Sequence, residues 1–100
     1  MNSIVFDPSA KDEFLNAIRF YNDCQNNLGN RFRLAIESAT QKISETPFMY
    51  RVLKAPFRRY LIPKFPYAII YSIEPDHIRI IAVAHNKRKP GYWSSRSSQL

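Results

Sequence analysis

The sequence has very little cysteine and histidine, and it contains no long apolar run. The only cysteine is Cys24, which excludes an intrachain disulfide and a cysteine-rich zinc site. With only two histidines in addition, we expect no structural metal and no cofactor. No apolar run approaches the roughly 20 residues that cross a bilayer, and the first residues, MNSIVFDPSAKDEF, lack the basic and then apolar order of a signal peptide. We therefore expect a soluble cytoplasmic protein without a membrane partner.

Acidic residues are scarce in one half of the chain. Residues 1–50 carry five Lys or Arg against six acids, a balance of −1, whereas residues 51–100 carry ten Lys or Arg against two acids, a balance of +8. The length of 100 residues and the apolar content of 45% predict one globular domain over residues 1–100. A small domain with one cationic half predicts an anionic partner, which can be nucleic acid, a nucleic-acid–protein machine or an acidic protein segment.

Two amphipathic helices are predicted in the first half. The first covers about residues 8–23, where Asp7 is expected to accept hydrogen bonds from the free N–H groups and Glu13 to favour the positive helix end. Asparagines and a glycine at 26–30 interrupt the pattern, and a second helix follows to about Glu45. Each helix carries one apolar stripe, so the pair should form a helical hairpin.

The apolar pattern changes to a period of two in the second half, which indicates strands. The strand candidates of the whole chain are Ser3–Phe6, Tyr50–Leu53, Tyr60–Pro63, Tyr67–Ile73 and Ile78–His85. The last two are apolar on both faces and should be central. In the final strand, one face is expected to consist of Ile78, Ile80, Ala82 and Ala84. This order predicts an α+β fold, in which an N-terminal strand and a helical hairpin pack on one face of a small antiparallel sheet whose other face is partly open.

Four motifs carry a resemblance to a known family. They are P-x-x-x-R-x-L at 47–53, R-R-Y-L at 58–61, F-P-Y-A-I-I-Y at 65–71 and I-R-I-I-A-V-A-H-N-K-R-K-P-G-Y-W at 78–93. Together with the N-terminal β-α-α unit, they resemble the RelE/ParE superfamily of type II toxin–antitoxin systems, in its ParE-like, plasmid-stabilisation branch. The resemblance covers essentially the whole chain. It implies a growth-arresting toxin that a cognate antitoxin holds inactive in a hetero-oligomer by wrapping its C-terminal segment around the toxin.

The resemblance implies one of two targets. ParE-like toxins poison DNA gyrase and are not known as hydrolases, whereas RelE-like toxins enter the ribosome and cut mRNA without a metal. The candidate catalytic residues for such cleavage are Arg59, His85, Arg88 and Tyr92. Ala68 stands where RelE-like toxins usually have an arginine, and Leu61 stands at another cationic position. These departures favour gyrase over mRNA cleavage. A nucleic-acid-binding module without toxicity is the third alternative.

A second set of residues is predicted to contact the target. Its members are Arg58, Lys64, Lys87, Arg88, Lys89 and Trp93. Each has an alternative role that needs no partner. Cations beside a strand can protect a sheet edge, those of residues 87–89 can form a solvated turn, Trp93 can pack on the sheet as a lid, and His85 can be a hydrogen-bonded strand end. Apolar side chains left exposed in the helical groove or along the sheet are candidates for antitoxin docking.

Overall fold

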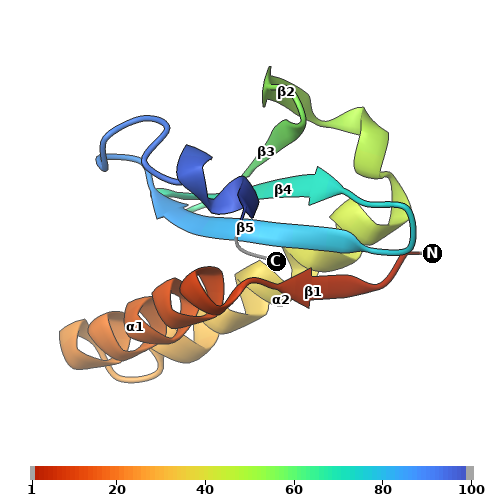
Figure 1. Cartoon of the computed structure of the whole chain (residues 1–100). Helices are drawn as coiled ribbons and strands as arrows, with labels where there is room; N and C mark the ends of the chain where they lie inside the picture. The colour runs from red at the N-terminus through yellow and green to blue at the C-terminus, as the bar shows by residue number, and fades with distance from the viewer. Residues whose placement is uncertain (1, 99–100) are drawn as a thin grey trace.

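The computed structural model describes residues 2–98, in which two long helices lie together on one side of a sheet (Figure 1). The elements in chain order are β1 (Ile4–Phe6), α1 (Pro8–Cys24), α2 (Leu28–Glu45), the short 3₁₀-helix η1 (Pro47–Met49), β2 (Arg51–Lys54), β3 (Phe57–Leu61), β4 (Tyr67–Ile73), β5 (Ile78–His85) and the 3₁₀-helix η2 (Ser94–Ser98). The predicted helical hairpin and the two long strands are confirmed. Within residues 2–98, no helix is long and apolar enough to cross a membrane.

The five strands follow the order β1-β5-β4-β3-β2, so the two apolar strands β4 and β5 lie inside the sheet as predicted. Strands β2 to β5 pair antiparallel, but β1 pairs parallel with β5, which makes the sheet mixed rather than purely antiparallel. Strand β3 begins at Phe57, three residues before the predicted start, because the turn at 55–56 joins it directly to β2. It ends at Leu61, ahead of Pro63, which has no N–H to donate.

The helical hairpin closes around Gly29. A Cβ atom on this residue would lie 2.3 Å from the carbonyl oxygen of Ile18 and 2.5 Å from the side chain of Asn22. Glycine therefore permits the close approach of α1 and α2, and its N–H donates to Asn22 Oδ1 at 2.8 Å. The α2 stripe that this approach presents to the sheet consists of the buried residues Phe32, Ile36, Ala39 and Ile43.

Asp7 does not cap α1, which corrects the prediction for this residue. Its side chain makes no capping hydrogen bond. Instead, its two carboxylate oxygens accept hydrogen bonds from Arg79 Nε at 2.7 Å and Nη2 at 2.8 Å. Only 6% of the Asp7 side chain and 4% of the Arg79 side chain are exposed. Leaving a buried arginine without a counter-charge costs far more free energy than leaving a helix N-terminus without a capping side chain. Asp7 therefore forms an ion pair with Arg79, which joins the start of α1 to β5.

A β-bulge in β5 overturns the predicted face for its second half. Ile70 pairs with Ala82, but the next residue of β4, Tyr71, pairs with Ile80, which leaves Ile81 as an extra residue. The bulge reverses the alternation of the following side chains. Ile78 and Ile80 therefore share the helix-side core with Val83, whereas Ala82 and Ala84 belong to a core on the opposite face.

The face opposite the helices is partly covered by the C-terminal segment. We refer to residues 91–98, which contain η2, as the tail; Figure 1 shows η2 over β5 on the side away from α1 and α2. A second, smaller core lies beneath the tail and consists of Phe57, Ile70, Ile81, Ala82, Ala84 and Trp93, with Tyr92 packed against it. This face is thus partly closed by a segment that has little regular structure.

Candidate functional site

A hollow of about 590 Å³ lies between the β2–β3 hairpin and the tail. We call it the cationic hollow. It is lined by Leu53, Lys54, Arg59, Ala68, Ile70, Ala84, His85, Asn86, Arg88, Lys89, Pro90, Gly91, Tyr92, Trp93 and Ser94. All four residues predicted as catalytic candidates line it, although they come from β3, from the end of β5, from the turn that follows β5 and from the tail. The four predicted residues therefore lie around one hollow.

The floor of the hollow is made of small apolar side chains. Ala68 on β4 and Ala84 on β5 are direct cross-strand partners, and both are buried. Two adjacent alanines occupy little volume above the sheet, so the larger side chains around them stand as walls. Ala68 stands at the position where RelE-like toxins usually have an arginine. In this chain it leaves space in the hollow and adds no charge.

Three cations stand at the hollow without an acidic partner. Within residues 2–98, the side chains of Lys54, Arg59 and Lys89 form no ion pair, and no acidic residue lines the hollow. Unneutralised charges of one sign around a concave surface produce a potential that attracts anions. Lys54 was missed by the sequence analysis, because the predicted strand ended one residue before it.

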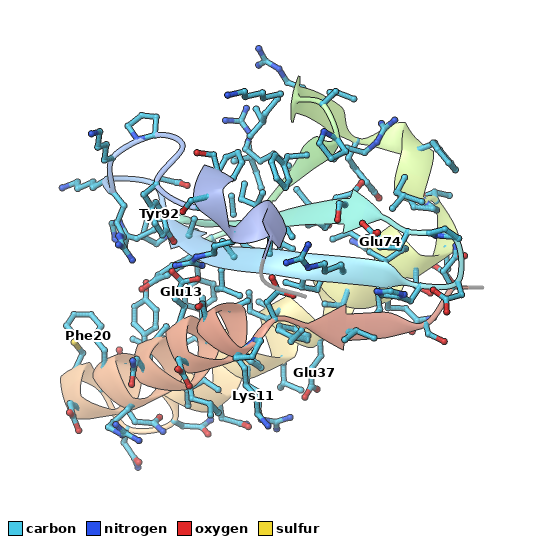
Figure 2. The ribbon with its side chains drawn as sticks, viewed as in Figure 1. Lys11, Glu13, Phe20, Glu37, Glu74 and Tyr92 are labelled. Carbon is cyan, nitrogen blue, oxygen red and sulfur yellow. The ribbon has the colours of Figure 1, made fainter. Side chains whose placement is uncertain are left out.

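Tyr92 is held by a carboxylate from α1. Its hydroxyl donates a hydrogen bond of 2.6 Å to Glu13 Oε2, and Figure 2 shows Glu13 on α1 below Tyr92 near the end of β5. Burial, with the hydrogen bond to Glu13 and its negative charge, raises the pKa of Tyr92 well above the usual range. The phenol is therefore a bound, protonated donor.

Arg88 and His85 also have partners inside the molecule. The Arg88 guanidinium lies over the Tyr92 ring, 3.7 Å from its centroid, and Nη1 is 3.3 Å from Glu13 Oε2. The Nδ1 atom of His85 accepts the backbone N–H of Lys87 at 3.0 Å, and its ring meets the Tyr67 ring edge-on at 5.0 Å. Since Nδ1 accepts, the proton of the neutral imidazole is on Nε2. His85 thus occupies the hydrogen-bonded position that was considered as its alternative.

The other predicted contact residues are spread over the molecule. Arg58 lies outside the hollow and donates to the carbonyl oxygens of Phe48 and Tyr50 at 3.0 and 2.8 Å. Lys64 lines a different groove beside α2, and Lys87 lies in the exposed turn after β5. Trp93 is only 7% exposed and packs on Phe57 with their ring centroids 5.1 Å apart, in the position of a lid on the sheet.

Glu13 is the residue of this region whose role the sequence did not reveal. It was expected only to favour the positive end of α1, yet it contacts residues from Val83 to Arg96, on the other side of the sequence. No local spacing indicates a contact across some 70 to 83 residues. In the part of the chain that the structure describes, no group of three or more His, Cys, Asp or Glu residues is placed to hold a metal ion.

The helical hairpin on a five-stranded mixed sheet is a fold that this chain shares with a solved structure. A solved structure described as "Chromosomal ParDE TA system from P. aeruginosa" aligns with a TM-score of 0.64 over 85% of this chain and 96% of that chain. The identity of 10% makes this a similarity of fold. Residues 4–90 match the family described as ParE toxin of type II toxin-antitoxin system, parDE. The chain belongs to this family, and membership implies an antitoxin partner. A comparison with curated protein sequences gave no match.

Proposed function

We propose that this chain arrests growth by binding DNA gyrase without hydrolysis, and that the cationic hollow is the surface that contacts the target. The observation that carries the proposal is that some side chains at the hollow have partners inside the molecule and, among the described residues, others do not. The Tyr92 hydroxyl and His85 Nδ1 already have partners inside the molecule, whereas Lys54, Arg59 and Lys89 form no ion pair within residues 2–98. Such a site is better suited to holding an anionic surface than to moving protons.

The chemistry of metal-free RNA cleavage makes the contrast specific. The reaction needs a base for the 2′-hydroxyl proton and an acid for the leaving oxygen. The Tyr92 hydroxyl donates to Glu13, and His85 Nδ1 accepts a backbone N–H. Ala68 supplies no charge near the scissile phosphate, where RelE-like toxins usually have arginine. These three features favour the ParE-like role.

A ribosome-dependent mRNA endonuclease is the second candidate function. The observation in its favour is that Arg59, His85, Arg88 and Tyr92 line one hollow. Binding at the ribosome would have to displace Tyr92 from Glu13 before its hydroxyl could act on a leaving group. The two candidate functions therefore assign different roles to the same residues, catalysis in one case and binding in the other. Measurements of mRNA integrity and of DNA supercoiling distinguish the two functions.

The antitoxin is proposed to neutralise the toxin through an acidic and apolar segment. A groove of about 450 Å³ runs between α2 and the β3–β4 turn, and its lining includes Arg31, Lys42 and Lys64 but no acid within the described residues. Leu34 lines the same groove and is half exposed. An exposed apolar side chain in such a groove fits the docking candidates that the sequence suggested, which were apolar residues left exposed in the helical groove or along the sheet. Charge complementarity there would speed association and fix the orientation of the partner.

The first test is induced expression of the full chain without an antitoxin, with total RNA and plasmid topology measured within minutes. We expect growth arrest with intact mRNA and with DNA breaks or altered supercoiling. Arg59→Ala should reduce the arrest strongly, since a bound charge-assisted contact is worth roughly tenfold or more in affinity. Arg33→Ala is the matched control, because Arg33 forms an exposed pair with Glu37 on α2.

Three results would contradict the proposal. Cut mRNA with normal supercoiling would establish the endonuclease instead. Unchanged growth would remove the toxin role. Tight binding to bare nucleic acid that falls steeply with salt would indicate the plain nucleic-acid-binding module, because phosphate contacts release counterions.

A further inference from the structure

The outer edge of β5 lacks a strand over half of its length. Strand β1 pairs only with Ile78 to Ile80, and the Asp7 N–H still reaches the Ile80 carbonyl at 2.9 Å. Beyond this point, within the described residues, side chains take the place of a strand. The Val83 N–H donates to Glu13 Oε1 at 3.1 Å, and Arg96 Nη1 donates to the Ile81 carbonyl at 3.1 Å. Buried backbone groups need such partners, so both side chains complete the sheet edge.

Glu13 connects this edge to the tail. Its carboxylate accepts five hydrogen bonds, and their donors are the Val83 N–H, the Tyr92 hydroxyl, Arg88 Nη1, and Nη1 and Nη2 of Arg96. The two Arg96 contacts are 3.0 and 3.1 Å long and use both carboxylate oxygens. Only 15% of the Glu13 side chain and 14% of the Arg96 side chain are exposed. A paired contact with this geometry and burial is much stronger than a surface ion pair.

The same tail residue is held from the other side. Arg79, which is paired with Asp7, donates to the backbone carbonyl of Arg96. Trp93, which lines the hollow, packs on Phe57. The tail is therefore held by the ion pair of Glu13 with Arg96 and by the hydrogen bond from Arg79, whose own ion-pair partner is Asp7 at the start of α1.

We propose that Glu13 is a positioning residue, which holds the tail and Arg88 in the places that shape the cationic hollow. Tyr92, Trp93 and Ser94 of the tail form one wall of the hollow. They lie beyond residues 4–90, the part of the chain that matches the ParE family. The functional consequence rests on the proposed function, because it assumes that the hollow contacts the target. The positional role does not depend on it.

Removing the Glu13 charge should open the tail locally. In Glu13→Gln, Arg88 and Arg96 lose their carboxylate, and Tyr92 loses its charged acceptor. The backbone N–H groups of Ser94 and Arg96 bond within the tail, to Gly91 and Trp93, so their hydrogen exchange reports on its opening. We expect exchange at these amides to become roughly tenfold faster or more, since several charge-assisted hydrogen bonds are lost.

Two controls distinguish local opening from general destabilisation. Glu37→Gln removes the same charge from an exposed pair with Arg33 and should leave the tail amides unchanged. Ile36→Val weakens the helix-side core, so hydrogen exchange at the slowest amides of α2 should become faster, and any change in the tail should accompany it. Exchange of the full-length variants is followed by NMR, with the α2 amides as the internal reference.

Fluorescence gives an independent readout because Trp93 is the only tryptophan of the chain. In Glu13→Arg, the new cation faces Arg88 and Arg96, and repulsion should release the tail. We expect the emission of Trp93 to shift to longer wavelength and its quenching by acrylamide to increase. If this variant does not fold, the exchange measurement on Glu13→Gln still decides.

The proposal fails if the tail amides of Glu13→Gln exchange as in the wild type, or if they change only in step with α2. In the functional arm, Glu13→Gln should inhibit gyrase less than Glu37→Gln does. An opened tail with full gyrase inhibition would overturn the functional consequence. If the wild-type chain leaves gyrase active, the proposed function fails, while the exchange result still tests the positional role of Glu13.

Discussion

The two faces of the sheet are closed by different means. The helix face is covered by the continuous stripe of α2 and by aromatic contacts, such as Phe32 with Phe65 and Tyr67 at 5.1 and 4.9 Å. The tail face has a smaller core that includes Trp93, and charged contacts of Arg79 and Glu13 hold the segment that covers it. The comparison indicates that the larger apolar core lies on the helix face, whereas the tail face carries the cationic hollow that we propose to contact the target.

The largest loss of stability is expected on the helix face. Phe32 is fully buried and contacts several rings. Phe32→Ala should lower the free energy of unfolding by about 3–5 kcal/mol, through lost transfer energy and the cavity left behind. Chemical denaturation measures this change. A loss below about 1 kcal/mol would show that the helix face is not the main source of stability.

Disruption of the buried ion pair between Asp7 and Arg79 should give the next largest loss of stability. Arg79→Met keeps most of the side-chain volume but leaves Asp7 buried without its cation. We expect a loss of about 3 kcal/mol, because an uncompensated buried charge is costly. The double variant Arg79→Met with Asp7→Leu should recover part of this loss in denaturation experiments. Equal stability of the single and double variants would contradict a role for the unpaired Asp7 charge.

A smaller effect on stability is expected from two hydrogen-bonded tyrosine hydroxyls, one on each face of the sheet. Tyr71 on the helix face donates to the Pro47 carbonyl at 2.6 Å, and burial raises its pKa to about 12. The unfolded chain, with its ordinary tyrosine pKa of 10.0, releases this proton first. The stability contributed by protonated Tyr71 is therefore fully present below pH 10 and is lost as the pH rises towards 12.

Tyr71→Phe removes this contribution and tests its sign. We expect the variant to be about 1 kcal/mol less stable at neutral pH, since one buried hydrogen bond is lost. Its unfolding free energy should also fall less steeply than that of the wild type between pH 10 and 12. Parallel curves in denaturant titrations across this range would refute the assignment. Tyr92, whose pKa is also raised, adds the same sign of dependence from the tail face.

The predictability of the two faces differs for a physical reason. The helices and the strands β4 and β5 were predicted because periodic apolar spacing and β-branched runs are local signals. The family motifs also placed Arg59, His85, Arg88 and Tyr92 in one set, and the structure brings them to one hollow. The family is confirmed by the match over residues 4–90.

The features that the sequence did not reveal depend on distant contacts. The extra residue Ile81 in β5 is set by pairing with β4, so it reversed the predicted positions of Ala82 and Ala84. Asp7 looked like a helix cap because a cap is a local motif, but its partner Arg79 is 72 residues away. Glu13 likewise has partners 70 and 83 residues away, in β5 and in the tail. No short window of sequence contains both members of these pairs.

Binding of gyrase by the cationic hollow is tested most directly by a supercoiling assay with purified gyrase, in which the full-length toxin is compared with Arg59→Ala and with the control Arg33→Ala. Messenger RNA on ribosomes is examined in parallel. We expect the wild type and Arg33→Ala to inhibit gyrase to the same extent, Arg59→Ala to inhibit it roughly tenfold less, and the RNA to stay intact. Equal inhibition by Arg59→Ala would contradict a role of the hollow in gyrase binding, and RNA cleavage with gyrase left active would contradict the proposed target.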